Sequence, residues 1–257
     1  MDGADVDAYL RRIGSPRPAV LDEIELCRLH RAHLRAVPFE NLSIHLGEPI
    51  SLVEHDLIDK IVRRGRGGFC YELNGAFAAL LRALGAEVRL LGARVFGEGG
   101  RPGPPLDHLA LVVRVADHPG EWLADVGFGR HSELALRYYS RAGQQDAGGL
   151  FHVLDADGGD VVVLRDGEPQ YLIEPHPREL ADFVPTCWWQ ATSPDSHFTR
   201  NPLCSRLTPD GRVTLTGRTL VRTGPDGRVE QTLADDELRA AYATYFDLRL
   251  DRLPARA

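Results

Sequence analysis

Apolar residues in the first third of the chain recur at the spacing of an amphipathic helix. Val6, Tyr9, Leu10 and Ile13 occupy positions i, i+3, i+4 and i+7, and Gly14 lies where such a helix would stop. The same periodicity predicts further helices over about residues 20–35, 52–64 and 70–85. The N-terminal third is therefore expected to be a group of helices.

Beyond residue 86 the pattern changes to short runs that are rich in Val and Leu and bounded by Gly/Pro loops, which is typical of strands. These runs predict strands at 87–95, 109–115, 121–126, 151–154, 161–165 and 169–173. The last third predicts a loop region over about 181–205, a hairpin with Pro-Asp-Gly turns at 209–211 and 225–227, and a closing helix at about 235–246. Helices, then strands, then a mixed end indicate an α+β fold.

Composition narrows the class of protein. With 257 residues, 43% hydrophobic and 26% charged, the chain can build a sizeable core, and its net charge of −7 argues against nucleic acid as the main partner. No apolar run is long enough to span a bilayer, and the first residues lack the apolar core of a signal peptide, so we expect a cytoplasmic protein with no membrane partner. The four cysteines are widely spaced, and no HExxH or paired-cysteine pattern occurs, so no metal site is expected.

The segment Arg66-Gly-Gly-Phe-Cys70-Tyr-Glu-Leu-Asn74 places one cysteine where a glycine turn feeds a helix. Free backbone N–H groups in the first turn of a helix carry partial positive charge. They stabilise a thiolate, which predicts for Cys70 a pKa of roughly 3.5–7.5 instead of about 8.5. Cys70 is therefore a candidate nucleophile, although a cysteine that opens an apolar helix can also be a small buried hydrophobe.

A thiolate nucleophile needs a base and a group that orients the base. His108 opens a buried-looking strand in Asp107-His-Leu-Ala-Leu, and Asp125 ends the next strand in Trp122-Leu-Ala-Asp-Val-Gly-Phe-Gly. Because strands adjacent in sequence usually lie adjacent in space, His108 and Asp125 can reach each other. Carboxylate, imidazole and thiolate then form a Cys-His-Asp triad. A structural histidine and a turn aspartate are the alternatives.

The ordered motifs RGGFCYELN, DHLALVV and DVGFG, with Val37–Leu42 and Thr192–Phe198 written VPFENL and TSPDSHF, resemble the arylamine N-acetyltransferase family from near residue 5 to about residue 246. The resemblance implies a helical bundle over 1–85 that carries the nucleophile. It implies a central β-barrel over 86–180 that carries the His and Asp of the triad, and an α/β lid over 181–257. The triad geometry of the family is similar to that of papain-like cysteine enzymes.

The family pattern assigns roles residue by residue. The nucleophile falls on Cys70, the base on His108 and the orienting acid on Asp125, and a structural ion pair falls on Arg66 and Glu40. The aromatic pocket residues of the family match four positions for which ordinary core packing is the alternative: Phe39, Tyr71, Phe128 and Phe198. The glycines expected near the cofactor are Gly127 and Gly129.

The implied reaction is ping-pong acetyl transfer from acetyl-CoA, a co-substrate rather than a tightly bound cofactor, to an arylamine or hydrazine. The chain departs from the family pattern at 130–140 and 186–190, which leaves the acceptor open. One alternative is an amide synthase of the same superfamily, which would take a polyketide acyl chain from a carrier protein and form a macrolactam. The triad is also compatible with a cysteine hydrolase or transglutaminase-like enzyme, and with a non-enzymatic binding or scaffold protein that keeps a relic triad.

Overall fold

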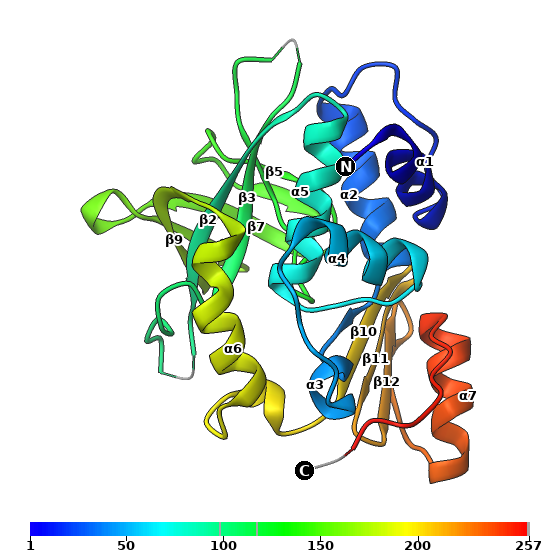
Figure 1. The fold of residues 1–257 in the computed structure, drawn as a ribbon. Helices are drawn as coiled ribbons and strands as arrows, with labels where there is room; N and C mark the ends of the chain where they lie inside the picture. Colours follow the sequence, from blue (N-terminus) through cyan, green and yellow to red (C-terminus); the bar gives the residue numbers. More distant parts are fainter. Residues whose placement is uncertain (98, 117, 256–257) are drawn as a thin grey trace.

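In the computed structural model, which describes residues 1–97, 99–116 and 118–255, the N-terminal region is helical (Figure 1). Its helices are α1 (Gly3–Arg12), α2 (Glu23–Ala36), α3 (Leu42–Leu46), α4 (Glu54–Ile58) and α5 (Cys70–Ala83), with a π-helical segment at Asp59–Arg63 after α4. Asp2 and Asp22 accept hydrogen bonds from the first turns of α1 and α2, which fixes where these helices begin. Every residue of α5 from Cys70 to Leu81 is buried, because α5 packs against both the other helices and the barrel strands.

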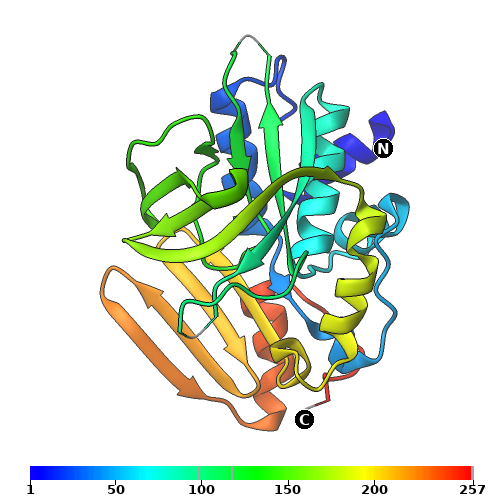
Figure 2. The same cartoon turned by 90° about the vertical axis from the view of Figure 1, so that its left-hand side faces the viewer.

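The middle of the chain forms an eight-stranded antiparallel sheet that is curved into a nearly closed barrel (Figures 1 and 2). Its strands are β2 (Glu87–Val95), β3 (His108–Arg114), β4 (Trp122–Ala124), β5 (Leu136–Arg137), β6 (Gln144–Asp146), β7 (Gly149–Asp155), β8 (Val161–Arg165) and β9 (Glu168–Arg178), in the order β5-β4-β3-β2-β9-β8-β7-β6. The Gln144 side chain accepts a hydrogen bond from the Arg137 amide at 2.6 Å and donates one to the Arg137 carbonyl at 3.0 Å. These bonds link the two end strands, β5 and β6.

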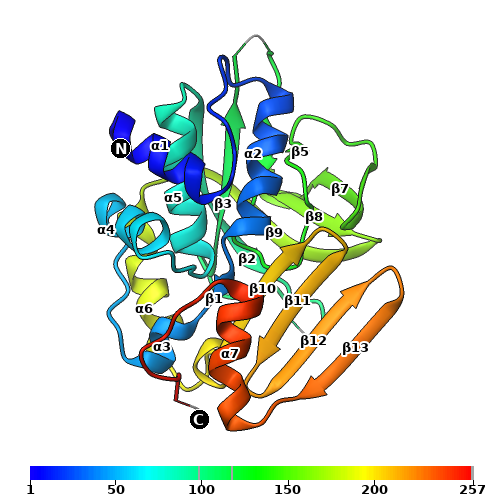
Figure 3. The same cartoon turned by 90° about the vertical axis from the view of Figure 1, so that its right-hand side faces the viewer.

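The C-terminal part contains a second antiparallel sheet, which α7 (Asp235–Phe246) covers on one side (Figure 3). Its strands are β10 (Leu203–Thr208), β11 (Gly211–Thr216), β12 (Thr219–Gly224) and β13 (Gly227–Thr232). The short strand β1 (Phe39–Glu40), between α2 and α3, pairs with β10 and forms one edge of this sheet. The expected α+β class with a central barrel is confirmed.

The prediction of a loop over about 181–205 is wrong in its first half. A 3-10 turn at Leu180–Phe183 leads into α6 (Val184–Thr192), and a second short turn follows at His197–Thr199. Phe183, Cys187 and Gln190 are buried at i, i+4 and i+7, and Pro185 lies in the first turn, where its missing N–H costs nothing. The helix is short and its outer face carries the exposed Trp188, so its apolar periodicity is weak in the sequence.

Three apolar cores hold the molecule together. The first lies among the helices, α5 and one face of β2–β4, and it also takes in Phe183, Cys187, Phe198 and Leu207. The second lies between the C-terminal sheet and α7, and the third fills the barrel. The first core crosses the boundaries expected at 85/86 and 180/181, so those boundaries stay a prediction. Within the described residues, no helix is both long and apolar enough to cross a membrane.

Candidate active site

Cys70 is the first residue of α5 and follows a glycine turn that packs tightly against the N-terminal segment. A Cβ atom on Gly67 would lie 2.0 Å from the carbonyl oxygen of Pro38. The amide of Glu40 donates a hydrogen bond of 2.8 Å to the carbonyl of Gly68. Only glycine fits at position 67, so close backbone approach fixes the turn that positions Cys70.

Three ion pairs support this turn, and two of them, Arg66–Glu40 and Lys60–Glu72, are buried. Arg66 Nη2 lies 2.9 Å from Glu40 Oε1, and Arg66 Nη1 lies 3.0 Å from Glu48 Oε2. Lys60, the single lysine of the chain, donates a 2.6 Å hydrogen bond to Glu72 in the first turn of α5. The expected Arg66–Glu40 pair is confirmed. Removing one partner of such a buried pair typically costs about 3–5 kcal/mol, because the other charge stays buried and unpaired.

The structure brings the three candidate triad residues together. His108 begins β3 and Asp125 directly follows β4, and His108 Nε2 lies 2.7 Å from Asp125 Oδ2. Cys70 and His108 line the same cavity, of about 220 Å³. Because an ionised carboxylate only accepts, Nε2 of His108 carries the proton of this bond and Nδ1 is left free to exchange a proton with Cys70.

The electrostatics of Asp125 favour a carboxylate. Burial alone would raise its pKa, but the charge of His108 and the hydrogen bond to it outweigh burial, so the pKa of Asp125 lies well below its ordinary value. Asp125 is therefore ionised at neutral pH and can stabilise an imidazolium on His108.

The expectation of a lowered Cys70 pKa is wrong. Burial raises the pKa of the Cys70 thiol well above its ordinary value, and the nearby Asp125 and Asp107 add to that effect. The thiol is only 3% exposed, so the start of α5 does not by itself make a thiolate. The nearest hydrogen-bond acceptor of Sγ is the carbonyl oxygen of Asp107 at 3.9 Å. The geometry therefore points to activation by transfer of the proton to His108 as the reaction begins.

Two residues that sequence reasoning missed support Asp125. Asn74, one turn beyond Cys70 on α5, donates to Asp125 Oδ1 at 2.9 Å and accepts from the amide of Val126 at 2.9 Å. His30 accepts from the amide of Asp125 at 3.1 Å. Asn74 stands in the RGGFCYELN motif at i+4 from Cys70, so its position on the same helix face was the available signal. Nothing in the sequence around His30 points to Asp125.

Aromatic rings surround the catalytic histidine candidate. The Phe128 and Tyr171 ring centroids each lie 5.2 Å from that of His108. Burial and the neighbouring Asp125 raise the pKa of Tyr171 well above its ordinary value, so its hydroxyl stays protonated. The rings keep water away from the His108–Asp125 bond, which strengthens it.

Of the predicted aromatic pocket residues, Phe39, Phe128 and Phe198 line the cavity with Cys70. Tyr71 does not: it is fully buried and its hydroxyl donates to the Leu106 carbonyl at 2.9 Å. This position fits the alternative of core packing for Tyr71.

The two predicted cofactor glycines differ in position. Gly127 lines the cavity, and a Cβ there would lie 2.8 Å from the Cα of Cys70, so only glycine lets this loop approach α5. Gly129 is not among the residues that line the cavity and has a φ of +87°, a conformation that favours glycine for the turn itself. Both assignments to the cofactor stay predictions.

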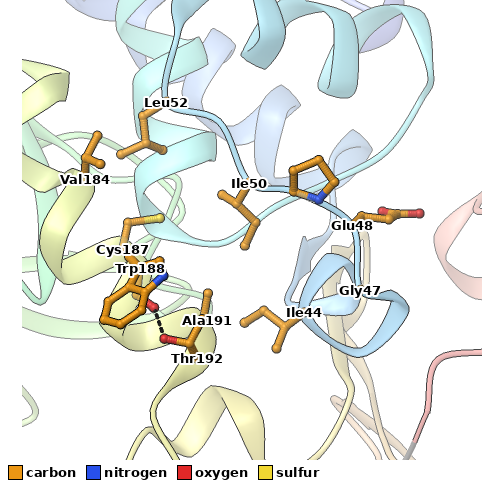
Figure 4. A pocket seen from close by; sticks show the side chains of 11 residues that line it. Ile44, Gly47, Glu48, Ile50, Leu52, Val184, Cys187, Trp188, Ala191 and Thr192 are labelled. Atoms are coloured by element: carbon orange, nitrogen blue, oxygen red, sulfur yellow. Dashed lines mark hydrogen bonds between the residues drawn. The ribbon is translucent and has the colours of Figure 1, made fainter.

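A larger cavity, of about 460 Å³, lies between α6 and the segment from α3 to Leu52 (Figure 4). Ile44, Ile50 and Leu52 line it from one side, and Val184 and Trp188 from the other. It contains no member of the triad, and its lining is mostly apolar. The smaller cavity, with its nucleophile and base, is therefore the candidate active site.

Comparison with known proteins gives consistent matches over almost the whole chain. A family model described as N-acetyltransferase matches residues 23–254. The arylamine N-acetyltransferase / N-hydroxyarylamine O-acetyltransferase of Salmonella typhimurium is 35% identical over 235 residues, which cover 89% of this chain and 83% of that protein. The arylamine N-acetyltransferase of Mycolicibacterium smegmatis is 36% identical and covers 84% and 81%.

Solved structures agree with the sequence matches. The Mycobacterium marinum arylamine N-acetyltransferase in complex with CoA superposes with a TM-score of 0.86 at 31% identity, covering 94% of this chain and 92% of that one. The Salmonella typhimurium structure superposes with a TM-score of 0.89 at 32% identity, covering 96% and 92%.

Proposed function

Because this chain belongs to the arylamine N-acetyltransferase family, we propose that it moves an acetyl group from acetyl-CoA to an arylamine or hydrazine through a thioester on Cys70. The family match confirms the resemblance carried by the five sequence motifs. The observation that carries the mechanism is the pairing of His108 with Asp125 at 2.7 Å, with His108 and Cys70 lining one cavity.

The first half-reaction acylates Cys70. As Sγ attacks the acetyl carbonyl of the thioester, its proton passes to Nδ1 of His108, and the ionised Asp125 stabilises the resulting imidazolium. The carbon–sulfur bond of acetyl-CoA then breaks, and His108 returns the proton to the departing CoA thiolate. One thioester replaces another, so the step is close to balanced in free energy.

The second half-reaction discharges the acetyl group. The amine nitrogen attacks the acetyl-Cys70 carbonyl, and His108 takes a proton from the nitrogen. The bond between the acetyl carbon and Sγ then breaks, and His108 returns the proton to Sγ, which regenerates the Cys70 thiol. Backbone N–H groups in the first turn of α5 are suited to hold the negative oxygen of each tetrahedral intermediate. A neutral arylamine needs no prior deprotonation, so one base serves both half-reactions.

The lining of the cavity suits a flat acceptor. Phe39 and Phe198 form a tilted pair with ring centroids 6.1 Å apart, and Phe128 packs edge-on against His108. Aromatic side chains bind an aromatic acceptor by stacked or edge-to-face contacts. The small volume of the cavity, about 220 Å³, favours a single-ring acceptor.

An initial-rate assay with acetyl-CoA and a panel of arylamines and hydrazines tests the proposal. Double-reciprocal plots at several acceptor concentrations should be parallel, as for a substituted enzyme, and Cys70→Ala should abolish turnover. Activity that persists in Cys70→Ala would contradict the covalent mechanism. Acylation of Cys70 by a carrier-bound acyl thioester but not by acetyl-CoA would favour the amide-synthase alternative.

A further inference from the structure

Three arginines from three segments line a small cavity beside the Gly127–Gly129 turn. Arg130 follows the Gly127–Gly129 turn, Arg165 ends β8 and Arg212 lies at the start of β11. The cavity has a volume of about 140 Å³ and is also lined by His131 and Gly148. It is too small for a whole cofactor, since typical ligand pockets have roughly 300–1,000 Å³, but it has room for one compact group.

The positive charges of this cavity are incompletely paired. Within the described residues, the Arg130 side chain has no hydrogen bond or ion pair. Arg165 Nε is buried without a hydrogen bond, and its nearest carboxylate oxygen, on Asp166, is 3.6 Å away. Arg212 Nη1 donates only to the hydroxyl of Ser205 at 3.1 Å. Guanidinium N–H groups are therefore available for an incoming acceptor.

Glu133 also lines the cavity and places one carboxylate beside the three guanidinium groups. The other two acidic residues nearby, Asp146 and Asp166, are engaged elsewhere. Asp146 accepts from the amides of Glu133, Leu134 and Gly148, at 2.5 to 3.2 Å. Asp166 accepts from the amide of Leu150 at 2.9 Å.

The arginines also repel one another. Burial and the nearby charges of Arg130 and Arg165 together lower the pKa of Arg212 to about 10, although Glu133 opposes them. Burial and Arg130 likewise lower the pKa of Arg165. Like charges held this close are stabilised when an anion binds between them.

The arginine cavity and the catalytic cavity share one loop. Gly127 and Phe128 line the catalytic cavity, whereas Arg130 and His131 line the arginine cavity. Three residues of extended chain span at most about 11 Å, so Arg130 begins within that distance of Gly127, whose backbone touches Cys70. Figure 3 shows the turn between β10 and β11 reaching toward the barrel strands β8 and β9 on this side of the molecule.

We propose that Arg130, Arg165 and Arg212 bind a phosphate group of the CoA thioester while its pantetheine arm extends along the Gly127–Gly129 turn to Cys70. The assignment rests on the proposed function. CoA carries its phosphates at the far end of a flexible arm from the sulfur, which matches an anion site set apart from the nucleophile. Arginine forms paired hydrogen bonds to phosphate oxygens, so three of them give both affinity and selectivity for a phosphorylated donor.

The test compares two acetyl donors with the same thioester. Acetyl-CoA carries phosphates and acetylpantetheine carries none, so the ratio of their kcat/KM values isolates the phosphate contribution. Each of Arg130→Gln and Arg165→Gln should lower this ratio by about 10- to 100-fold, the usual range for one lost charge-assisted bond. The matched control is Arg222→Gln on β12. Its register partner is Val213, so Arg222 points to the opposite face of the sheet from Arg212.

A binding measurement separates failure of this assignment from failure of the proposed function. Calorimetry with CoA should show weaker binding to Arg165→Gln than to the wild type and Arg222→Gln. If CoA binds in that pattern but no acetyl group is transferred, the proposed function fails and the arginine site stands. If Arg165→Gln and Arg222→Gln bind CoA equally, or if Arg130→Gln and Arg165→Gln slow both donors equally, the arginine site is overturned.

Discussion

At the scale of single residues, the surroundings of the candidate nucleophile disfavour its reactive thiolate form. Cys70 is buried, and burial raises the pKa of its thiol, so we propose that the reactive thiolate forms when His108 accepts the proton. That acceptance depends on Asp125, which stays ionised beside His108 and stabilises its protonated form. In this proposal the reactivity of Cys70 depends on all three residues.

Asp125→Asn tests this dependence. The amide retains the size of the carboxylate and can still accept from His108, but it no longer stabilises the imidazolium. We expect a folded protein whose Cys70 is acylated about 10⁴-fold more slowly, as in other triads. Single-turnover mass spectrometry gives the rate, and circular dichroism checks the fold. Near-normal acylation would contradict the role of Asp125.

Asp107 predicts a pH dependence of stability. Burial raises its pKa to about 6, and its Oδ1 accepts from the amide of Val95 at 2.9 Å. A carboxyl whose pKa is higher in the folded than in the unfolded state contributes stability below about pH 4, and that contribution is lost as the pH rises through 6. Asp107→Asn keeps the acceptor and removes the titration.

We therefore expect Asp107→Asn to gain stability relative to wild type as the pH rises from 4 to 7. The gain should be up to about 3 kcal/mol, the equivalent of roughly two pKa units. Urea unfolding of both proteins at the two pH values measures it. A difference between the proteins that does not vary with pH would show that Asp107 has an ordinary pKa.

The candidate site was predictable from sequence where residue type and motif coincide, and not where tertiary contacts decide. Cys70, His108 and Asp125 each follow a distinctive local pattern, and the structure brings them together. The raised pKa of Cys70 depends on how deeply the fold buries it. The position of Tyr71 in the core depends on the neighbouring elements, which no local pattern reveals.

At the scale of elements, α5 connects the candidate nucleophile Cys70 to Asp125, the candidate orienting acid. Cys70 and Asn74 lie one turn apart on the same helix face. The Asn74 side chain forms hydrogen bonds with the Asp125 carboxylate and with the amide of Val126, in the loop after β4. The amide also donates to the Leu109 carbonyl on β3 at 2.6 Å. One side chain thus fixes the relative positions of α5, β3 and β4.

Substitutions at Asn74 should separate positioning from charge. Asn74→Ala removes all three hydrogen bonds. Asn74→Asp keeps the acceptor for the Val126 amide, loses the two donated bonds and places a second carboxylate against the buried Asp125, which raises the pKa of Asp125. We expect Cys70 acylation to slow by about 10- to 100-fold in Asn74→Ala and further in Asn74→Asp. The pH dependence of acylation should shift to higher pH only in Asn74→Asp. Equal rates and equal pH profiles in the two variants would refute this order.

The elements themselves were predictable where their periodicity is strong. The bounds of β2, β8 and α7 agree with the sequence pattern to within a residue, because each is long enough or flanked by clear turn residues. β1, β5 and β6 have two or three residues each, too few to show any period. α6 was missed because only a few of its positions are buried.

At the scale of the whole molecule, the catalytic cavity forms where the three parts of the chain meet. α5 supplies Cys70, the barrel supplies His108 and Phe128, and the C-terminal part supplies Phe198. Asn41 connects the N-terminal helical part to the C-terminal part. Its side chain donates to the carbonyls of Phe198 and Asn201 at 2.8 and 3.0 Å and accepts from the amide of Leu203 at 2.7 Å.

Asn41→Ala should therefore weaken both the fold and the acceptor side of the cavity. Three bonds of a buried residue are lost and their backbone partners stay buried, so we expect the free energy of unfolding to fall by about 2–4 kcal/mol. Because Phe198 and Leu203 both line the cavity, KM for the amine should rise more than KM for acetyl-CoA. Urea unfolding and initial-rate kinetics measure the two effects. Unchanged stability would mean that other contacts hold the C-terminal part in place.

The most direct measurement is the mass of the peptide that contains Cys70 before and after each half-reaction. After acetyl-CoA alone, this peptide should gain one acetyl group, and an arylamine should then remove it and appear as its acetamide. Cys70→Ala and Asp125→Asn, run in parallel, should give no label and a slowly formed label, respectively. A Cys70 peptide that stays unmodified while acetyl-CoA is consumed and acetylated amine accumulates would contradict transfer through Cys70.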